Sequence, residues 1–294
     1  MPNVRRIKEL LEGITPVRIE QIRGEILRKE QELVHEAEHG DRLDETHKLM
    51  VLNNIRDNLI PQHPQTIGQL MLQFFSSASS YSVLREYLRR QFLLLCHQDR
   101  YPILDDFKLL LYKIFNKPLF QNDATWDPIA LEVLAKEIQT EQNYNLDSRE
   151  PLPRIVAILV TAPPVIQEIF GEDINQKYHE IEGLQNIPDA FERANSLWRF
   201  AENVQKHNNL KIKHVGTALV CDFLKESGFK NYAKIDFQMI NAINNIIGEG
   251  CRKFNNFELF VATQWISQQI NITPFKLDKI LYVYGWMNGR NNRR

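Results

Sequence analysis

Cysteine is scarce in this chain, and the few that occur lie far apart. Cys96, Cys221 and Cys251 are the only three, and none of them belongs to a CxxC pair. This spacing argues against a disulfide framework and against a zinc ribbon. Three cysteines are also one short of the four that hold an iron–sulfur cluster. The cysteines therefore suggest neither a structural metal nor a cluster.

Long apolar runs are missing as well. No run approaches the ~20 residues that a bilayer-spanning helix needs. The first eleven residues carry Arg5, Arg6, Lys8 and Glu9, and the apolar segment of a secretory signal does not follow them. We expect a soluble, cytoplasmic protein without a membrane partner.

The chain has no excess of positive charge, because 36 basic residues face 37 acidic ones and the formal net charge is −1. This balance argues against non-specific binding of nucleic acid by the whole surface. Between Lys206 and Lys234, however, lysines outnumber the two acids, Asp222 and Glu226. A nearly neutral protein with such a stretch can still present a basic face to phosphates.

Helical periodicity runs through the whole sequence. In Arg18–Glu38, for example, apolar residues recur every three or four positions with charged residues between them. The β-branched run Ile155–Val160 has no apparent partner strand, so we interpret it as a buried helix that Pro163 and Pro164 close. With 43% hydrophobic and 10% aromatic residues, the chain can form one large domain or two packed lobes. We predict an all-α, two-lobed fold.

The polar, proline-bearing stretch Asn143–Pro153 is the best candidate for a junction between the lobes. We therefore predict an N-terminal helical region over residues 1–150 and a second helical region over residues 151–294. The motif that indicates a function lies in the second region.

That motif is Ile212–Ala218, followed after a fixed interval by Lys234-Ile235-Asp236. We predict a helix over Ala190–Val204, a turn over Lys211–Gly216, a second helix over Thr217–Leu224 capped at Gly228, and Asp236 at the start of the next helix. The arrangement resembles the helix-hairpin-helix DNA glycosylases. In that family the hairpin grips a DNA phosphate and the aspartate drives removal of a base.

The resemblance implies a role for each residue of the motif. The backbone of Val215, Gly216 and Ala218 would bind a phosphate at the N-terminus of the second helix. The DNA-binding residues would be Lys211, Lys213, His214, Val215, Gly216, Thr217, Ala218 and Lys234. Gly216 would supply backbone angles that other residues avoid and a close approach to DNA.

Asp236 would be the catalytic residue. Its carboxylate would stabilise the positive charge that develops on the sugar, or activate the attacking water. The target nucleotide would be flipped out of the duplex into a pocket between the lobes. This chemistry needs no cofactor and no metal, and we expect the protein to act on duplex DNA as a monomer.

The chain departs from the family pattern at three positions. The family turn usually reads Pro-Gly-Val-Gly, whereas this chain has Lys213-His214-Val215-Gly216. Bifunctional members carry a lysine where Ala218 stands, and many members have histidine where Gln238 stands. Without that lysine no Schiff base with the sugar can form there. We therefore expect a monofunctional DNA glycosylase that leaves an abasic site, for base excision in DNA repair or for antiviral defence against phage DNA with modified bases.

Two other functions fit the same residues. An N-glycosidase of free modified nucleosides would keep Asp236 but would not need to grip a phosphate. A non-catalytic helical scaffold that binds DNA or protein would need neither.

A separate motif, His35-Glu36-Ala37-Glu38-His39, fits the HExxH pattern of zinc proteases. Sites of that kind lie on a largely apolar, buried helix. Here Glu38 lies between the histidines, and Gly40-Asp41 ends the helix directly after them. We interpret this motif as a solvated, charged helix end.

Overall fold

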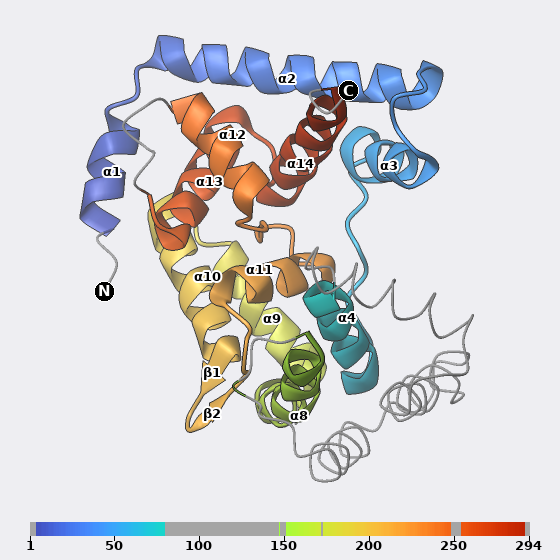
Figure 1. Cartoon of the computed structure of the whole chain (residues 1–294). Coiled ribbons are helices and arrows are strands. Elements are labelled where there is room, and N and C mark those ends of the chain that lie inside the picture. Colours follow the sequence, from blue (N-terminus) through green and yellow to red (C-terminus); the bar gives the residue numbers. More distant parts are fainter. Residues whose placement is uncertain (1–3, 80–146, 148–150, 172, 248–253, 292–294) are drawn as a thin grey trace. The chain divides into compact units, whose positions relative to one another are not determined.

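The computed structural model describes residues 4–79, 147, 151–171, 173–247 and 254–291. These residues are predominantly helical, and the one sheet among them has two short strands (Figure 1). The predicted all-α class is therefore confirmed for the described part of the chain. None of its helices is long and apolar enough to cross a membrane.

The chain forms two compact units, and neither unit is a continuous stretch of sequence. Unit 1 contains the described residues of Met1–His63, His179–Ala201 and Leu224–Arg294, and unit 2 contains those of Pro64–Tyr178 and Glu202–Phe223. The predicted regions 1–150 and 151–294 were continuous. Of the predicted junction Asn143–Pro153, all but Asp147 and Pro151–Pro153 lie outside the described residues, and Pro151–Pro153 begin a helix.

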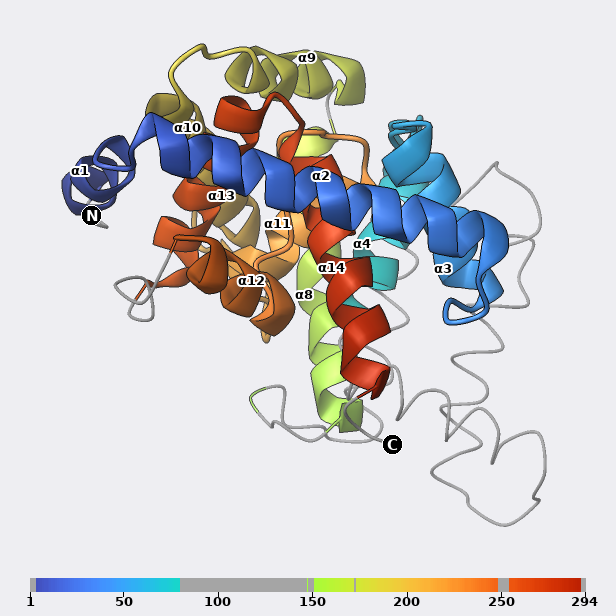
Figure 2. The same cartoon turned by 90° about the horizontal axis from the view of Figure 1, so that it is seen from above.

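Unit 1 is built on the long helix α2 (Pro16–His39), which runs above α12 (Phe237–Ile247), α13 (Asn256–Ile270) and α14 (Pro274–Asn291) in Figure 1 and passes across α13 and α14 in Figure 2. Thr15 caps α2 by accepting a hydrogen bond from the Arg18 backbone N–H, and Pro16 follows at the first helical position. Ile22, Ile26 and Leu33 of α2 are fully buried. An N-terminal helix thus covers C-terminal ones, which is why unit 1 is discontinuous.

Two arginines of α2 bind the ends of the helices beneath it. The Arg18 guanidinium donates to the Ile246 carbonyl near the end of α12 at 2.6 Å, and that of Arg23 donates to the Gln269 carbonyl of α13 at 2.9 Å. The last carbonyls of a helix have no partner within the helix. The two arginines supply those partners and favour the negative end of each helix dipole.

The centre of unit 1 is α13, which is buried along nearly its whole length. Asn255 and Glu258 form a capping box at its start, and Asn271, with φ +59°, ends it in the left-handed conformation. The remaining described elements of unit 1 are α1 (Val4–Glu12), α3 (Glu45–Met50), the π-helix η1 (Val51–Arg56), most of α9 (Ile174–Gln185), the start of α10 (Ala190–Gln205) and the end of α11 (Thr217–Glu226).

Unit 2 contains α4 (Ile67–Ser79), α8 (Pro151–Phe170) and the short strands β1 (Lys206–His207) and β2 (Leu210–Lys211). The prediction that Ile155–Val160 is helical is confirmed, but the expectation that Pro163 and Pro164 close the segment is wrong, because α8 continues to Phe170. Proline fits helical φ, but inside a helix it removes a backbone donor and its ring crowds the carbonyl four residues earlier. The helix is held on both sides of the prolines by its buried apolar face, which includes Ala162, Val165 and Ile166.

The end of α11 matches the predicted cap. Gly228 has φ +97°, its N–H donates to the Lys225 carbonyl at 3.1 Å, and the Phe229 N–H donates to the Leu224 carbonyl at 3.2 Å. This pair of bonds defines a Schellman motif. A Cβ at position 228 would lie 2.5 Å from the Pro61 carbonyl oxygen.

A Gly228→Ala variant is therefore expected to lose about 1–3 kcal/mol of unfolding free energy. Both the left-handed backbone and the close contact with the Pro61 carbonyl oppose the added methyl group, and the His63 ring lies 2.9 Å from the same position. Urea unfolding monitored by circular dichroism measures the loss. Gly24→Ala on α2 is the control, since a Cβ there meets no atom within 4 Å. Equal stability of the two variants would contradict the prediction.

Candidate nucleic-acid interface

The predicted hairpin element begins and ends as the sequence indicated. Helix α10 spans Ala190–Gln205 and α11 spans Thr217–Glu226, each within two residues of its predicted bounds. Between them the chain forms the antiparallel pair β1–β2 before it reaches the turn, and this pair was not predicted. Asn208-Asn209 at the tip is the signal that could have revealed it, since asparagine favours the left-handed conformation that Asn208 adopts with φ +51°.

The turn is fixed to α8 by a hydroxyl group. Thr161 Oγ1 accepts a hydrogen bond from the Lys213 backbone N–H at 2.9 Å and donates one to the Ala157 carbonyl at 2.6 Å. The Ile212 side chain beside this contact is fully buried. The start of the turn is therefore a rigid part of unit 2 rather than a loose loop.

Gln205, the last residue of α10, fixes the other side of the turn. Its side-chain amide donates to the Val215 carbonyl at 2.9 Å, and its side-chain oxygen accepts from the Thr217 hydroxyl at 3.3 Å. A trans peptide is planar, so the Gly216 N–H points opposite to the Val215 carbonyl. Because Gln205 draws that carbonyl toward itself, the Gly216 N–H points away from Gln205.

Four successive backbone N–H groups of the turn have no acceptor in the described part of the chain: those of Val215, Gly216, Thr217 and Ala218. Three of these residues are exposed or half-buried, and only the Val215 side chain is buried. The Gly216 carbonyl accepts from the N–H groups of Leu219 and Val220, so α11 begins directly after it. Free N–H groups at the positive end of a helix favour an anion.

The special backbone angle of the turn belongs to His214 and not to Gly216. His214 has φ +59°, whereas Gly216 is not in the left-handed region. The expectation that Gly216 supplies unusual backbone angles is therefore wrong. His214 stands at the position of the first glycine in the Pro-Gly-Val-Gly turn. A positive φ at this position is one that glycine adopts without strain. Gly216 itself is exposed, and a Cβ added to it would meet no atom within 4 Å.

The two lysines predicted to flank the phosphate differ in their surroundings. The Lys213 ammonium lies 2.8 Å from an Asp147 carboxylate oxygen, and this contact holds the pKa of Asp147 below its ordinary value by hydrogen bonding and by charge. Lys211 is exposed on β2. Of the two, Lys213 already has a carboxylate partner.

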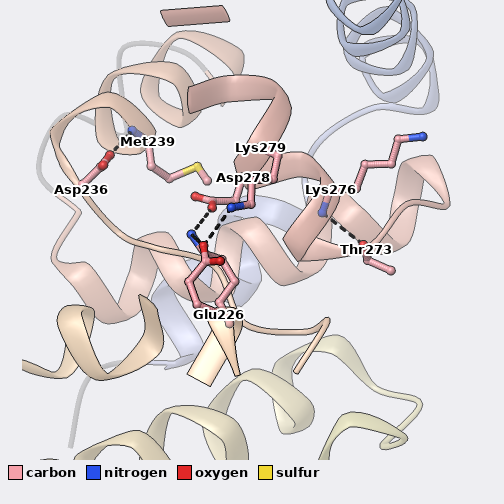
Figure 3. Close-up of polar contacts among 8 residues, drawn as sticks. Glu226, Asp236, Met239, Thr273, Lys276, Asp278 and Lys279 are labelled. Carbon is pink, nitrogen blue, oxygen red and sulfur yellow. Dashed lines mark hydrogen bonds and ion pairs between the residues drawn. The ribbon is translucent and has the colours of Figure 1, made fainter. Parts of the chain in front are cut away.

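Asp236 lies directly before α12, as predicted, and caps it. One carboxylate oxygen accepts a hydrogen bond from the Met239 N–H at 3.0 Å (Figure 3). The Asp236 carbonyl accepts from the Ile240 N–H at 2.9 Å. The residue is half-buried, as is Lys234. Asp236 and Lys234 belong to unit 1, whereas the turn with its four N–H groups belongs to unit 2.

A four-residue ionic cluster joins the end of α11 to α14 within unit 1. Lys225 Nζ lies 2.6 Å from an oxygen of Asp278 and 3.2 Å from one of Glu226, and Lys279 Nζ lies 2.8 Å from that same Glu226 oxygen (Figure 3). Lys225, Asp278 and Lys279 are buried. The sequence offered no signal for this cluster, because the partners in each of the pairs Lys225–Asp278 and Glu226–Lys279 are 53 residues apart.

The HExxH stretch is the end of α2, as interpreted, but it is not solvated throughout: His35, Glu38 and His39 are exposed, whereas Glu36 and Ala37 are buried. Glu36 is buried and accepts hydrogen bonds from the backbone N–H and the guanidinium of Arg42, both at 2.7 Å. Burial opposes the charge on Glu36, but the Arg42 contacts outweigh it and lower the pKa of the carboxyl. Among the described residues no group of three or more histidine, cysteine, aspartate or glutamate side chains could hold a metal ion.

Comparison with known proteins gives no relative: no family model, no curated protein and no solved structure matches the chain.

Proposed function

We propose that this protein is a monofunctional DNA glycosylase, which hydrolyses the N-glycosidic bond of a damaged or modified base in DNA and leaves an abasic site. The observation that carries the proposal is the run of four backbone N–H groups without acceptors at Val215–Ala218. Such a run, at the start of a 10-residue helix, is the kind of backbone arrangement that binds a phosphate group in proteins.

Asp236 supplies the chemistry in this proposal. Cleavage of an N-glycosidic bond builds positive charge on the sugar, as in glycoside hydrolysis, and a carboxylate stabilises that charge. A carboxylate can also activate the water that attacks the sugar. Ala218 carries no amine, so the reaction ends at the abasic site without a Schiff base and without strand cleavage through one.

The test is direct release of bases. The protein is incubated with genomic DNAs that carry different modified bases, including DNA from phages, and released bases are identified by mass spectrometry. Release of one modified base from one kind of DNA supports the proposal, and borohydride is expected to trap no covalent adduct. Failure to release any base from any of the DNAs counts against it.

The position of Gln205 gives a prediction about phosphate binding. Gln205→Met removes the donor to the Val215 carbonyl, so the direction of the Gly216 N–H is no longer fixed. A hydrogen bond to a charged group contributes about 1.5–3 kcal/mol, so losing one weakens binding of an abasic duplex roughly 10- to 100-fold. Fluorescence anisotropy measures the dissociation constant.

The matched control for this prediction is Thr217→Val. It removes only the hydroxyl contact with Gln205 and leaves the bond from Gln205 to the Val215 carbonyl in place. Binding within about threefold of the wild type is expected for this variant, well below the tenfold loss that one charged hydrogen bond represents. Equal losses in the two variants would show that the turn is merely disordered by either change.

One observation favours a second candidate, a non-catalytic helical scaffold. The hydrogen bond from the Met239 N–H gives Asp236 a complete structural role as the cap of α12. In a scaffold that role would be the only one. The two candidates differ in what replacement of the carboxylate does to base release.

A further inference from the structure

Two lysines face each other across the β1–β2 hairpin. Lys206 and Lys211 are direct partners in the antiparallel register, and His207 pairs with Leu210 next to the tip. The Ile212 N–H donates to the Gln205 carbonyl at 3.0 Å on the other side of the lysine pair. In an antiparallel ladder, hydrogen-bonded and non-hydrogen-bonded pairs alternate. Gln205 and Ile212 form a hydrogen-bonded pair, so the next pair, Lys206 and Lys211, is a non-hydrogen-bonded one. Opposite side chains lie closest in pairs of this kind.

This arrangement is unfavourable for the protein alone. Like charges directly opposite each other destabilise a pair of strands. Both lysines are exposed, and neither forms an ion pair with any residue that the structure describes. The nearby acid, Glu168, does not relieve them, because it contacts the His207 ring at 3.5 Å and accepts from Asn208 at 2.6 Å.

The alternation of side chains explains why Glu168 is directed elsewhere. Successive residues of a strand point to opposite faces, so His207 lies on one face and Lys206 and Lys211 lie on the other. His207 is half-buried and contacts Glu168 of α8, and the buried Ile212 lies on the same face. The lysine pair is thus on the face of the hairpin that points away from α8.

We propose that Lys206 and Lys211 together hold a phosphate of the DNA backbone, in addition to the phosphate at the Val215–Ala218 turn. The inference rests on the proposed function, because it assigns the partner as DNA. One anion between two ammonium groups converts their repulsion into attraction, and β2 continues directly into the turn. The β1–β2 hairpin and the turn then follow one DNA backbone with two contacts. The resemblance implies the contact at the turn and a DNA-binding role for Lys211, whereas the phosphate site shared by Lys206 and Lys211 is new.

The experiment compares three forms of the full chain: wild type, Lys206→Gln/Lys211→Gln, and Lys206→Glu. Binding to a fluorescein-labelled duplex with a tetrahydrofuran abasic analogue is measured over a range of KCl concentrations. Each lysine–phosphate contact adds about one to the slope of log affinity against log salt concentration. The double variant is expected to lower that slope by about one to two and to weaken binding at least tenfold at low salt.

Thermal unfolding distinguishes this role from a structural one. Removal of the repulsion leaves the melting temperature of the double variant equal to or above that of the wild type, and Lys206→Glu raises it because an ion pair with Lys211 replaces the repulsion. Weaker binding together with unchanged or higher stability supports the proposal. A lower melting temperature in both variants overturns it, because the lysines would then be part of the folded framework.

The control is Arg28→Gln, which removes an exposed cation of α2 that has no ion pair among the described residues. Its slope and affinity are expected to match the wild type. If the wild type binds the duplex and the double variant binds equally well with the same slope, the lysine contact is wrong while DNA binding stands. If the wild type binds DNA with the expected slope but releases no base from any DNA, the glycosylase proposal fails while the lysine contact stands. Absence of any salt-dependent binding by the wild type overturns both.

Discussion

Asp236→Asn is expected to slow base release strongly while the protein remains folded. Loss of a positioned general base typically slows a reaction about 10²- to 10⁴-fold, and we expect a loss of this size in the rate of base release under single-turnover conditions. Asparagine keeps a side-chain oxygen that can accept from the Met239 N–H, and the two residues are about equally good as N-caps. The variant therefore removes the carboxylate charge and keeps the cap.

Asp236→Ala is the comparison that separates the cap from the chemistry. It removes both the charge and the hydrogen bond to Met239, so it should lose activity as Asn does and also lose about 0.5–2 kcal/mol of unfolding free energy. Asp236→Asn should lose no more than the about 0.3–1 kcal/mol that a negative charge contributes at a helix N-terminus. Undiminished base release by Asp236→Asn would leave Asp236 as a helix cap and favour the scaffold.

The elements that the sequence predicted well are those whose signals are local. The cap at Gly228 depends on one residue that tolerates φ +97°. The start of α12 depends on Asp236, whose side chain accepts from the N–H three residues further on. Bounds of α10 and α11 followed from apolar spacing in the same way. In each case the residues that determine the structure are neighbours in the chain.

The parts of the candidate interface that the sequence did not predict depend on contacts between distant residues. Thr161 binds the Lys213 N–H across 52 positions, and no local pattern marks a threonine for that role. Gln205 is only 10 positions from Val215, but it reaches that residue because β1 and β2 turn the chain back on itself. The register that sets Lys206 against Lys211 likewise depends on a two-residue turn that was not recognised. The directions of the backbone N–H and carbonyl groups in the turn could therefore not be predicted from the sequence.

The largest expected loss of stability comes from the ionic cluster, through Asp278→Asn. The side chains of Lys225 and Asp278 are 4% and 6% exposed, and their charged atoms are 2.6 Å apart. Asp278→Asn takes away the shorter of the two carboxylate contacts of Lys225, at 2.6 Å against 3.2 Å to Glu226, in a poorly solvated place. Breaking such a buried ion pair typically destabilises by about 3–5 kcal/mol. We expect the urea concentration at the midpoint of unfolding to fall by this free energy divided by the m-value, and the m-value itself to stay unchanged.

Lys276→Gln is the control for that loss. Lys276 pairs with Glu30 at 2.8 Å, but the two side chains are 16% and 19% exposed, so water can still solvate whichever charge remains. We expect the loss there to stay near 1 kcal/mol or below, as for other accessible pairs. If Asp278→Asn lost no more unfolding free energy than Lys276→Gln, burial would not explain the contribution of the cluster to stability.

A double variant, Lys225→Met/Asp278→Leu, then shows what the pair contributes to the fold. Two apolar side chains of similar size remove both buried charges together, and such replacements are often neutral or stabilising. Glu226 keeps its contact with Lys279 at 2.8 Å, so no acid is left without a cation. We expect the double variant to regain most of the stability that Asp278→Asn loses. A double variant as unstable as Asp278→Asn would mean that the end of α11 and α14 are held together by these charges themselves and not by the apolar packing around them.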